Sequence, residues 1–99
     1  MRIVRAAYVY ILASGIGGTL YVGAATNLIA RMHQHRSGAV KGFTKKYKVD
    51  RLVYYEVFDD LEGAFLRERQ LKKWNRSWKI ELIEKSNPNW SDLYPEIAT

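Results

Sequence analysis

The sequence contains no cysteine and no long apolar run among its 99 residues. Without cysteine the chain can form neither disulfide bonds nor a zinc site with thiolate ligands. Its longest apolar run, Ala6–Ala13, is far shorter than the roughly 20 residues that a membrane-spanning helix needs. The first residues also lack the long apolar segment of a signal peptide. We therefore expect a cytoplasmic protein with no membrane partner.

Positive charge, by contrast, is abundant. The 16 lysines and arginines outnumber the 10 acidic residues, so the formal net charge is +6 and the isoelectric point is about 9.7. A basic surface favours polyanionic partners, because each neutralised phosphate releases counterions. Basic surfaces also occur on proteins that bind no nucleic acid, so charge alone leaves both interpretations open.

The pattern of apolar, β-branched and aromatic residues predicts three strands, over residues 6–12, 19–23 and 51–58. The first two flank the glycine-rich turn 14–18 and predict an antiparallel hairpin. In the third strand, strict alternation would divide the side chains between the two faces of the sheet. The expected sets are Val53, Tyr55 and Val57 on one face and Leu52, Tyr54, Glu56 and Phe58 on the other.

Capping residues predict the helices. One helix is expected from Thr26 or Asn27 to Gly38, a second from Asp59 or Asp60 to about Trp74, and a third over 75–84. The basic segment 41–48 predicts a loop with one helical turn.

The predicted order is therefore β-β-α-β-α-α, with an extra short helix before the third strand. This is an α+β fold, sandwich-like, in which helices flank a small three-stranded antiparallel sheet. We expect one domain over 1–99, with its core in 7–86 and a tail, 87–99, that packs back on the body through Trp90, Leu93 and Tyr94.

One carboxylate lies on an otherwise apolar helix stripe. Leu61, Ala64, Phe65 and Leu71 share one side of the second helix at about 100° per residue, and Glu68 lies within that stripe. A carboxylate that faces a core must be paired, hydrogen-bonded or bound to a metal. An ion pair with Lys72 or with Arg31 is the alternative to a metal site.

Arg31 and His35 lie on the side of the first helix that also carries Leu28 and Met32. We expect both to face the sheet at the border of the core. Arginine suits phosphate contact and histidine titrates near neutral pH, although a solvated pair at the rim fits the spacing as well.

Three further residues have alternative interpretations. Tyr10 and Tyr21 would ordinarily be packing residues with a tethered hydroxyl. Gly23 serves a positive φ, a close approach of another part of the chain, or a plain junction between strand and helix.

Two basic clusters suit a phosphate backbone, although charge runs are often only solvated faces. The first comprises Lys41, Lys45, Lys46, Lys48 and Arg51, interleaved with Phe43 and Tyr47. The second comprises Arg67, Arg69, Lys72, Lys73, Arg76 and Lys79. As DNA-binding residues we select Lys41, Lys45, Lys46, Arg67 and Lys72.

Together these positions resemble the GIY-YIG nuclease family. Tyr8-Val9-Tyr10 stands where the first motif is expected, with Tyr-Val in place of Gly-Ile, and Tyr21-Val22-Gly23 matches the second. Arg31 follows Tyr21 by ten residues, His35 follows four later, and Glu68 lies on the helix after the third strand. The resemblance covers about 7–86 and is to the small stand-alone bacterial branch, often described as uncharacterised endonuclease-like proteins.

The resemblance implies a metal-dependent endonuclease that hydrolyses DNA phosphodiester bonds in repair, recombination or processing, on DNA that can be branched or damaged. Glu68 would hold one Mg²⁺ or Mn²⁺, and Tyr10, activated by nearby positive charge, would accept a proton from the attacking water. Arg31 would stabilise the transition state. Tyr21 and His35 would orient the water or the phosphate, and Gly23 would complete the motif.

The sequence departs from the family pattern at two places. Many members carry an asparagine about a dozen residues after the glutamate, where this chain has Ile80; Asn75 is nearer, and Asn87 and Asn89 are further. Ala24 replaces a lysine that some relatives place after the second motif. A non-catalytic nucleic-acid-binding module is therefore a second hypothesis. A protein-interaction domain that docks through the Trp90–Tyr94 tail is a third.

Overall fold

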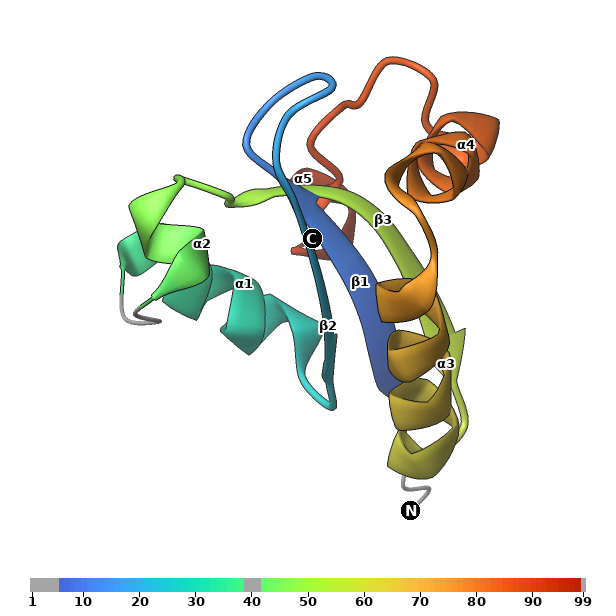
Figure 1. The fold of residues 1–99 in the computed structure, drawn as a ribbon. Helices are drawn as coiled ribbons and strands as arrows, with labels where there is room; N and C mark the ends of the chain where they lie inside the picture. The colour runs from blue at the N-terminus through green and yellow to red at the C-terminus, as the bar shows by residue number, and fades with distance from the viewer. Residues whose placement is uncertain (1–5, 39–41, 99) are drawn as a thin grey trace.

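The computed structural model describes residues 6–38 and 42–98, and the α+β fold expected from the sequence is confirmed (Figure 1). A three-stranded antiparallel sheet with strand order β2-β1-β3 is flanked by helices. The elements of the described residues are β1 (Ala7–Ala13), β2 (Leu20–Ala25), α1 (Leu28–Ser37), α2 (Phe43–Lys46), β3 (Arg51–Phe58), α3 (Leu61–Lys73), α4 (Arg76–Ser86) and α5 (Tyr94–Ile97). None of these helices is both long and apolar enough to cross a bilayer.

The predicted hairpin forms β1 and β2. Its turn is closed by a backbone hydrogen bond of 3.0 Å from Ser14 N–H to the Thr19 carbonyl, and Gly17 adopts a φ of 65° that favours glycine. β2 continues to Ala25, two residues beyond the predicted end. The helical turn expected in the basic segment is α2.

The strict alternation expected for β3 is wrong near its start. Ile11 of β1 pairs with Tyr54, but the next residue, Leu12, pairs with Leu52, so Val53 is an extra residue in β3. Such a bulge breaks the period of two. As a result Val53 and Tyr54 pack on the same face of the sheet, while Leu52 packs on the opposite face.

Each face of the sheet carries its own apolar core. One core joins Val9 and Ile11 to Ala64 and Leu71 of α3, and also includes residues of α4 and the tail. The other core contains side chains of all three strands, of α1 and of the loop before β3, namely Tyr10, Leu12, Ala25, Leu28, Met32, Val49 and Leu52. Figure 1 shows the result, with α1 and α3 on opposite sides of the sheet and β2, the edge strand, between them.

The helix ends follow the predicted capping signals. Asn27 accepts a 3.0 Å hydrogen bond from the backbone N–H of Ala30, and Gly38 ends α1 in the left-handed region. Asp60 caps α3 by accepting from Gly63 N–H at 2.7 Å.

The predicted apolar stripe of α3 is wrong at Phe65, whose side chain is 45% exposed. Ala64 and Leu71 are fully buried and define the direction that faces the core. Phe65 lies about 100° round the helix from Ala64 and therefore faces solvent. Glu68 lies between these extremes and is half-buried.

The tail packs on the body as expected. Trp90 is buried, and its indole N–H donates a 2.7 Å hydrogen bond to Glu84. Leu93 N–H donates to the carbonyl of Leu52 at 2.7 Å, and Asp92 accepts from Leu52 N–H at 3.3 Å. Because the side chain of Trp90 is buried in the core, it cannot contact a docked protein partner.

Candidate active site

Gly23 makes room for Tyr10. The two residues are partners in the β1–β2 register. A β-carbon on Gly23 would lie 2.5 Å from the Tyr10 hydroxyl and 2.6 Å from its Cζ. The glycine is therefore needed for close approach of a side chain. It is not among the described glycines with positive φ, and it is not a plain junction.

Tyr10, Tyr21 and His35 form one aromatic cluster contributed by β1, β2 and α1. The Tyr10 hydroxyl lies 3.4 Å from Nε2 of His35. The ring centroid of Tyr21 lies 6.4 Å from that of Tyr10 and 5.6 Å from that of His35. Tyr10 and His35 are buried and Tyr21 is half-buried. Three positions far apart in the sequence are thus brought together.

Arg31 and Glu68 approach this cluster from opposite faces of the sheet. Arg31 is half-buried on α1, one turn before His35. Burial and then the charge of Arg31 lower the pKa of His35, and the same charge partly opposes the burial that raises the pKa of Tyr10. Glu68, on α3, is near enough for its carboxylate to raise the pKa of Tyr10. Figure 1 shows α1 and α3 on opposite sides of the sheet, with β2, the edge strand that carries Gly23, between them.

Glu68 also has the ion-pair partner that its helical spacing allowed. Its side chain is 18% exposed, and its carboxylate lies 3.2 Å from Nζ of Lys72, one turn further along α3. Lys72 is itself mostly exposed, so the pair is worth at most about 1 kcal/mol. A contact of this strength can be displaced by a more highly charged ligand.

The protonation states of Tyr10 and His35 are complementary. Burial, assisted by Tyr21 and Glu68 and opposed by Arg31, raises the pKa of Tyr10, so the phenol keeps its proton at neutral pH. Burial and the positive charge of Arg31 lower the pKa of His35, while Asp50 opposes them, so the imidazole is neutral there. A protonated phenol therefore faces a neutral imidazole. The nearby positive charge of Arg31 does not by itself make Tyr10 a base.

The residues fit a metal ion with a single protein ligand. Within 6–38 and 42–98, no group of three or more histidine, aspartate or glutamate side chains could share a metal ion. Mg²⁺ keeps several waters and often takes only one or two protein carboxylates together with substrate phosphates. The half-buried carboxylate of Glu68 suits that mode of binding.

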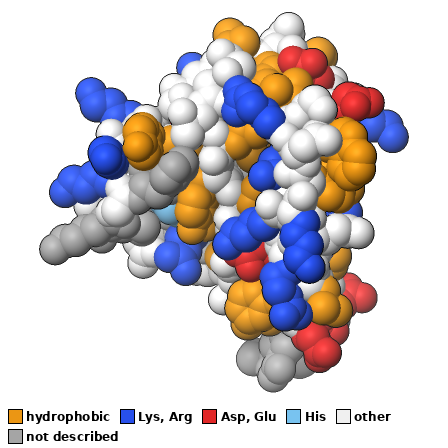
Figure 2. All heavy atoms as spheres, in the orientation of Figure 1, with side chains coloured by type: hydrophobic (Ala, Val, Ile, Leu, Met, Phe, Trp, Pro, Cys, Tyr) orange, Lys and Arg blue, Asp and Glu red, His pale blue; other side chains and the backbone are white. Residues whose placement is uncertain are grey.

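The residues selected for DNA contact differ in their environment. Lys45 and Lys46 are exposed on α2, and Lys72 pairs with Glu68. Lys41 lies outside the described residues, so its DNA contact stays a prediction. Figure 2, viewed like Figure 1, shows Lys and Arg side chains over both the α3 side and the α1–α2 side of this face.

Arg67 is half-buried and its guanidinium already has partners within the protein. Its guanidinium donates two hydrogen bonds of 3.0 Å to Glu56 and lies 5.2 Å from the ring centroid of Trp74. Burial acts to raise the pKa of Glu56, but bonds from Arg67 and Tyr54 outweigh it and hold the pKa below its usual value. A DNA contact by Arg67 would have to compete with these bonds.

The asparagines near the expected family offset serve the fold. Asn75 caps α4 by accepting from Trp78 N–H at 2.9 Å. Asn87 is buried, where its amide donates to the carbonyls of Val53 and Ser91 at 3.0 and 2.9 Å. Asn89 is exposed. Sequence spacing could not separate these roles, because each depends on where a helix begins or ends.

Comparisons with known proteins identify the family of this chain. The GIY-YIG catalytic domain family matches residues 6–81. A UPF0213 protein of Syntrophus aciditrophicus is 42% identical over 82% of this chain and 92% of its own, and one of Pediococcus pentosaceus is 35% identical over 87% and 90%.

A solved structure is also similar. The solution NMR structure of a UPF0213 protein from Bacillus halodurans has a TM-score of 0.55 at 29% identity, covering 88% of this chain and 92% of that one. The region that the GIY-YIG family matches, residues 6–81, contains all five residues of the candidate site, from Tyr10 to Glu68. The chain therefore belongs to the GIY-YIG family of nuclease domains.

Proposed function

We propose that this protein is a metal-dependent endonuclease that hydrolyses DNA phosphodiester bonds. The observation that carries the proposal is the packing of Tyr10, Tyr21 and His35 against one another. Arg31 acts electrostatically on Tyr10 and His35, and Glu68 on Tyr10. Phosphodiester hydrolysis requires a group that stabilises negative charge, groups that transfer protons and a ligand for a metal ion. Arginine, the tyrosine–histidine pair and a carboxylate can serve these three purposes.

Tyr10 and His35 move the proton in this proposal. The attacking water loses a proton to the Tyr10 oxygen while the phenol passes its own proton to Nε2 of His35, 3.4 Å away. The resulting hydroxide attacks phosphorus, the bond from phosphorus to the leaving oxygen breaks, and that oxygen takes a proton from solvent water. His35 then returns its extra proton to solvent, and the centre is neutral again. This relay avoids the phenolate that burial of Tyr10 disfavours, and it assigns His35 more than the orienting role implied by the resemblance.

Arg31 and Glu68 serve the phosphate. Arg31 neutralises the negative charge that grows on the phosphoryl oxygens. Glu68 would hold one Mg²⁺ or Mn²⁺, which when bound supplies Lewis acidity and lowers the pKa of a coordinated water. Tyr21 lies against both Tyr10 and His35 and orients the water.

Outside the centre, exposed Lys45 and Lys46 would contact the DNA backbone, with Lys41 added from the sequence. We further propose a cytoplasmic role in DNA repair, recombination or processing, with branched or damaged DNA as the substrate.

Incubating the protein with supercoiled plasmid and with branched DNA, with Mg²⁺, Mn²⁺ or EDTA, tests the proposal. We expect nicking that EDTA abolishes. Glu68→Gln should lower the rate by about 100-fold or more. The matched control is Glu62→Gln, an exposed glutamate on the same helix, which should cut normally. Failure of the wild type to nick, or normal cutting by Glu68→Gln, would reject the proposal that this protein is a metal-dependent endonuclease.

A non-catalytic nucleic-acid-binding module is the second candidate. The ion pair between Lys72 and Glu68, which occupies the only carboxylate proposed for the metal, favours it. This candidate predicts DNA binding that weakens with salt and an intact plasmid at every Mg²⁺ and Mn²⁺ concentration tested.

A further inference from the structure

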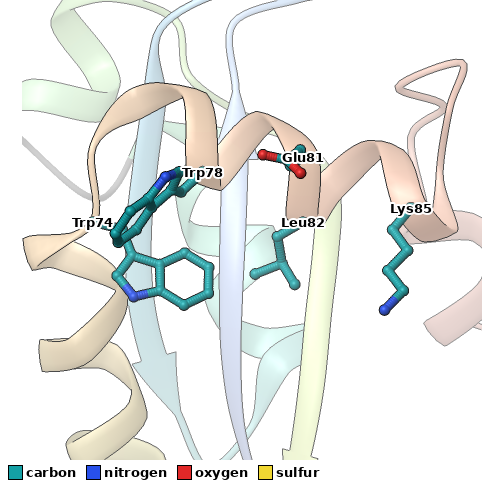
Figure 3. Close-up of a pocket in the computed structure, with 5 residues that line it drawn as sticks. All are labelled: Trp74, Trp78, Glu81, Leu82 and Lys85. Carbon is teal, nitrogen blue, oxygen red and sulfur yellow. The ribbon is translucent and has the colours of Figure 1, made fainter.

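A groove on the outer side of α3 and α4 lies apart from the cluster of Tyr10 and His35. Two adjoining hollows of about 620 and 550 Å³ share Trp74 and Trp78 in their walls. The first is completed by Glu81, Leu82 and Lys85, and the second by Leu66, Arg69, Gln70 and Lys73. Figure 3 shows the two indoles together at one end of the first hollow, with Leu82 and Lys85 further along α4.

The groove presents one indole to solvent and holds it in place. Trp78 is 53% exposed. It meets Trp74 edge to face, with ring centroids 5.8 Å apart and an interplanar angle of 87°. Trp74 is in turn covered by the guanidinium of Arg67, which Glu56 holds through bonds of 3.0 Å. The exposed face of Trp78 therefore rests on a Trp74 ring that is itself held in place, and this arrangement suits stacking on a flat ligand.

The charges around the indoles identify the ligand. Arg69 and Lys73 line one end of the groove and Lys85 lines the other, while Glu81 is the single acidic residue among the lining residues described. A flat apolar platform between cations matches a nucleobase flanked by its phosphates, the combination by which proteins hold single-stranded nucleic acid. A paired duplex offers no free base face to Trp78.

We propose that this tryptophan groove binds an unpaired stretch of nucleic acid, with a base stacked on Trp78 and phosphates on Arg69, Lys73 and Lys85. The inference rests on the proposed nucleic-acid substrate and narrows it to strands with an unpaired segment. Glu68 and Trp74 are six residues apart along α3 and its C-cap, a rise of about 9 Å along the helix axis. This separation is small enough for a single substrate with a junction between duplex and single strand to pass from one place to the other around the helix.

Fluorescence anisotropy in EDTA, where nothing is cut, tests this groove separately from catalysis. The probes are labelled dT20, a blunt 20-base-pair duplex and a forked duplex. Trp78→Leu keeps an apolar side chain but removes the stacking face, and should weaken dT20 and fork binding about 10-fold or more with little change for the blunt duplex. Trp78→Phe, which keeps an aromatic face, should stay within about threefold of wild type.

Each outcome decides between the hypotheses. If wild type and Trp78→Leu bind dT20 with equal affinity, and circular dichroism shows both to be folded, the proposal that the groove binds unpaired nucleic acid is wrong. This holds even if the protein nicks the plasmid. A concentration-dependent dimer that Trp78→Leu abolishes assigns the groove to a second copy of the chain and also overturns it. Trp78-dependent binding of dT20 without any nicking keeps the groove and rejects the nuclease. If neither dT20 nor duplex binds, both proposals fail.

Discussion

The hydroxyl of Tyr10 occupies the space that any side chain on Gly23 would need. A β-carbon on Gly23 would lie only 2.5 Å from that hydroxyl. The glycine of the second motif is thus the space into which the tyrosine of the first motif fits. The phenol that fills this space is also subject to the charges of Arg31, which lowers its pKa, and Glu68, which raises it, although burial is the largest effect. The two motifs act as one structural unit.

Gly23→Ala should therefore displace the Tyr10 ring. We expect the free energy of unfolding to fall by about 1–3 kcal/mol, together with loss of cutting. Gly15→Ala is the matched control, since a β-carbon there meets nothing within 4 Å. Urea denaturation of both variants measures the difference. Equal stability of Gly23→Ala and wild type would contradict the close approach.

Lys72→Met should make Glu68 a better metal ligand by removing its ion-pair partner. Since such a pair is worth at most about 1 kcal/mol, Mn²⁺ should bind up to about fivefold more tightly. Calorimetric titration of the DNA-free protein with Mn²⁺ measures this. Lys73→Met, the exposed neighbour that lines the tryptophan groove, should bind Mn²⁺ as wild type does. Weaker Mn²⁺ binding by Lys72→Met, or an equal gain in both variants, would argue against a metal at Glu68.

Stability should depend on pH through His35. Its pKa is lowered from 6.5 in the folded protein, so just below 6.5 the unfolded chain binds more protons than the folded one. The free energy of unfolding is therefore largest above pH 6.5 and falls as pH drops toward the folded pKa. Melting temperatures between pH 8 and 5 should fall less steeply for His35→Gln than for His33→Gln, whose histidine is exposed. Identical slopes would show that His35 does not cause the dependence.

Asn87→Ala should destabilise the protein without touching the chemistry. The substitution would remove the hydrogen bonds that the Asn87 side chain makes to the carbonyls of Val53 and Ser91 and to Ser91 N–H. We expect a loss of about 1–3 kcal/mol, read from chemical denaturation, whereas Asn89→Ala on the surface should change stability by less than about 0.5 kcal/mol. If the folded Asn87→Ala variant kept its stability and lost only cutting, the asparagine would belong to the active site after all.

The fold was largely predictable because its signals are local. Asn27, Asp60 and Asn75 each cap a helix through bonds to residues three positions away. The errors have physical causes as well. The bulge at Val53 depends on a partner strand about 40 residues earlier, and the exposure of Phe65 depends on which side of α3 meets the sheet.

The candidate site was predictable only in part. The resemblance selected its residues, but the contacts among them are non-local. The electrostatic effect of Glu68 on Tyr10 depends on α3 and α1 covering opposite faces of one small sheet, which the spacing of residues along the sequence does not encode. The tryptophan groove was not predicted, because the mutual position of Trp74 and Trp78 depends on the break between α3 and α4.

The attachment of the tail to Leu52 bears on how copies of the protein behave at high concentration. Leu52 belongs to β3, the other edge of the sheet, and its N–H and carbonyl are both engaged by Asp92 and Leu93. Free groups on an edge strand are templates for pairing with another molecule. We expect a chain cut before Asn87 to leave the N–H and carbonyl of Leu52 open to pairing with a neighbouring molecule, so residues 87–98 cover an edge of the sheet as well as completing the core.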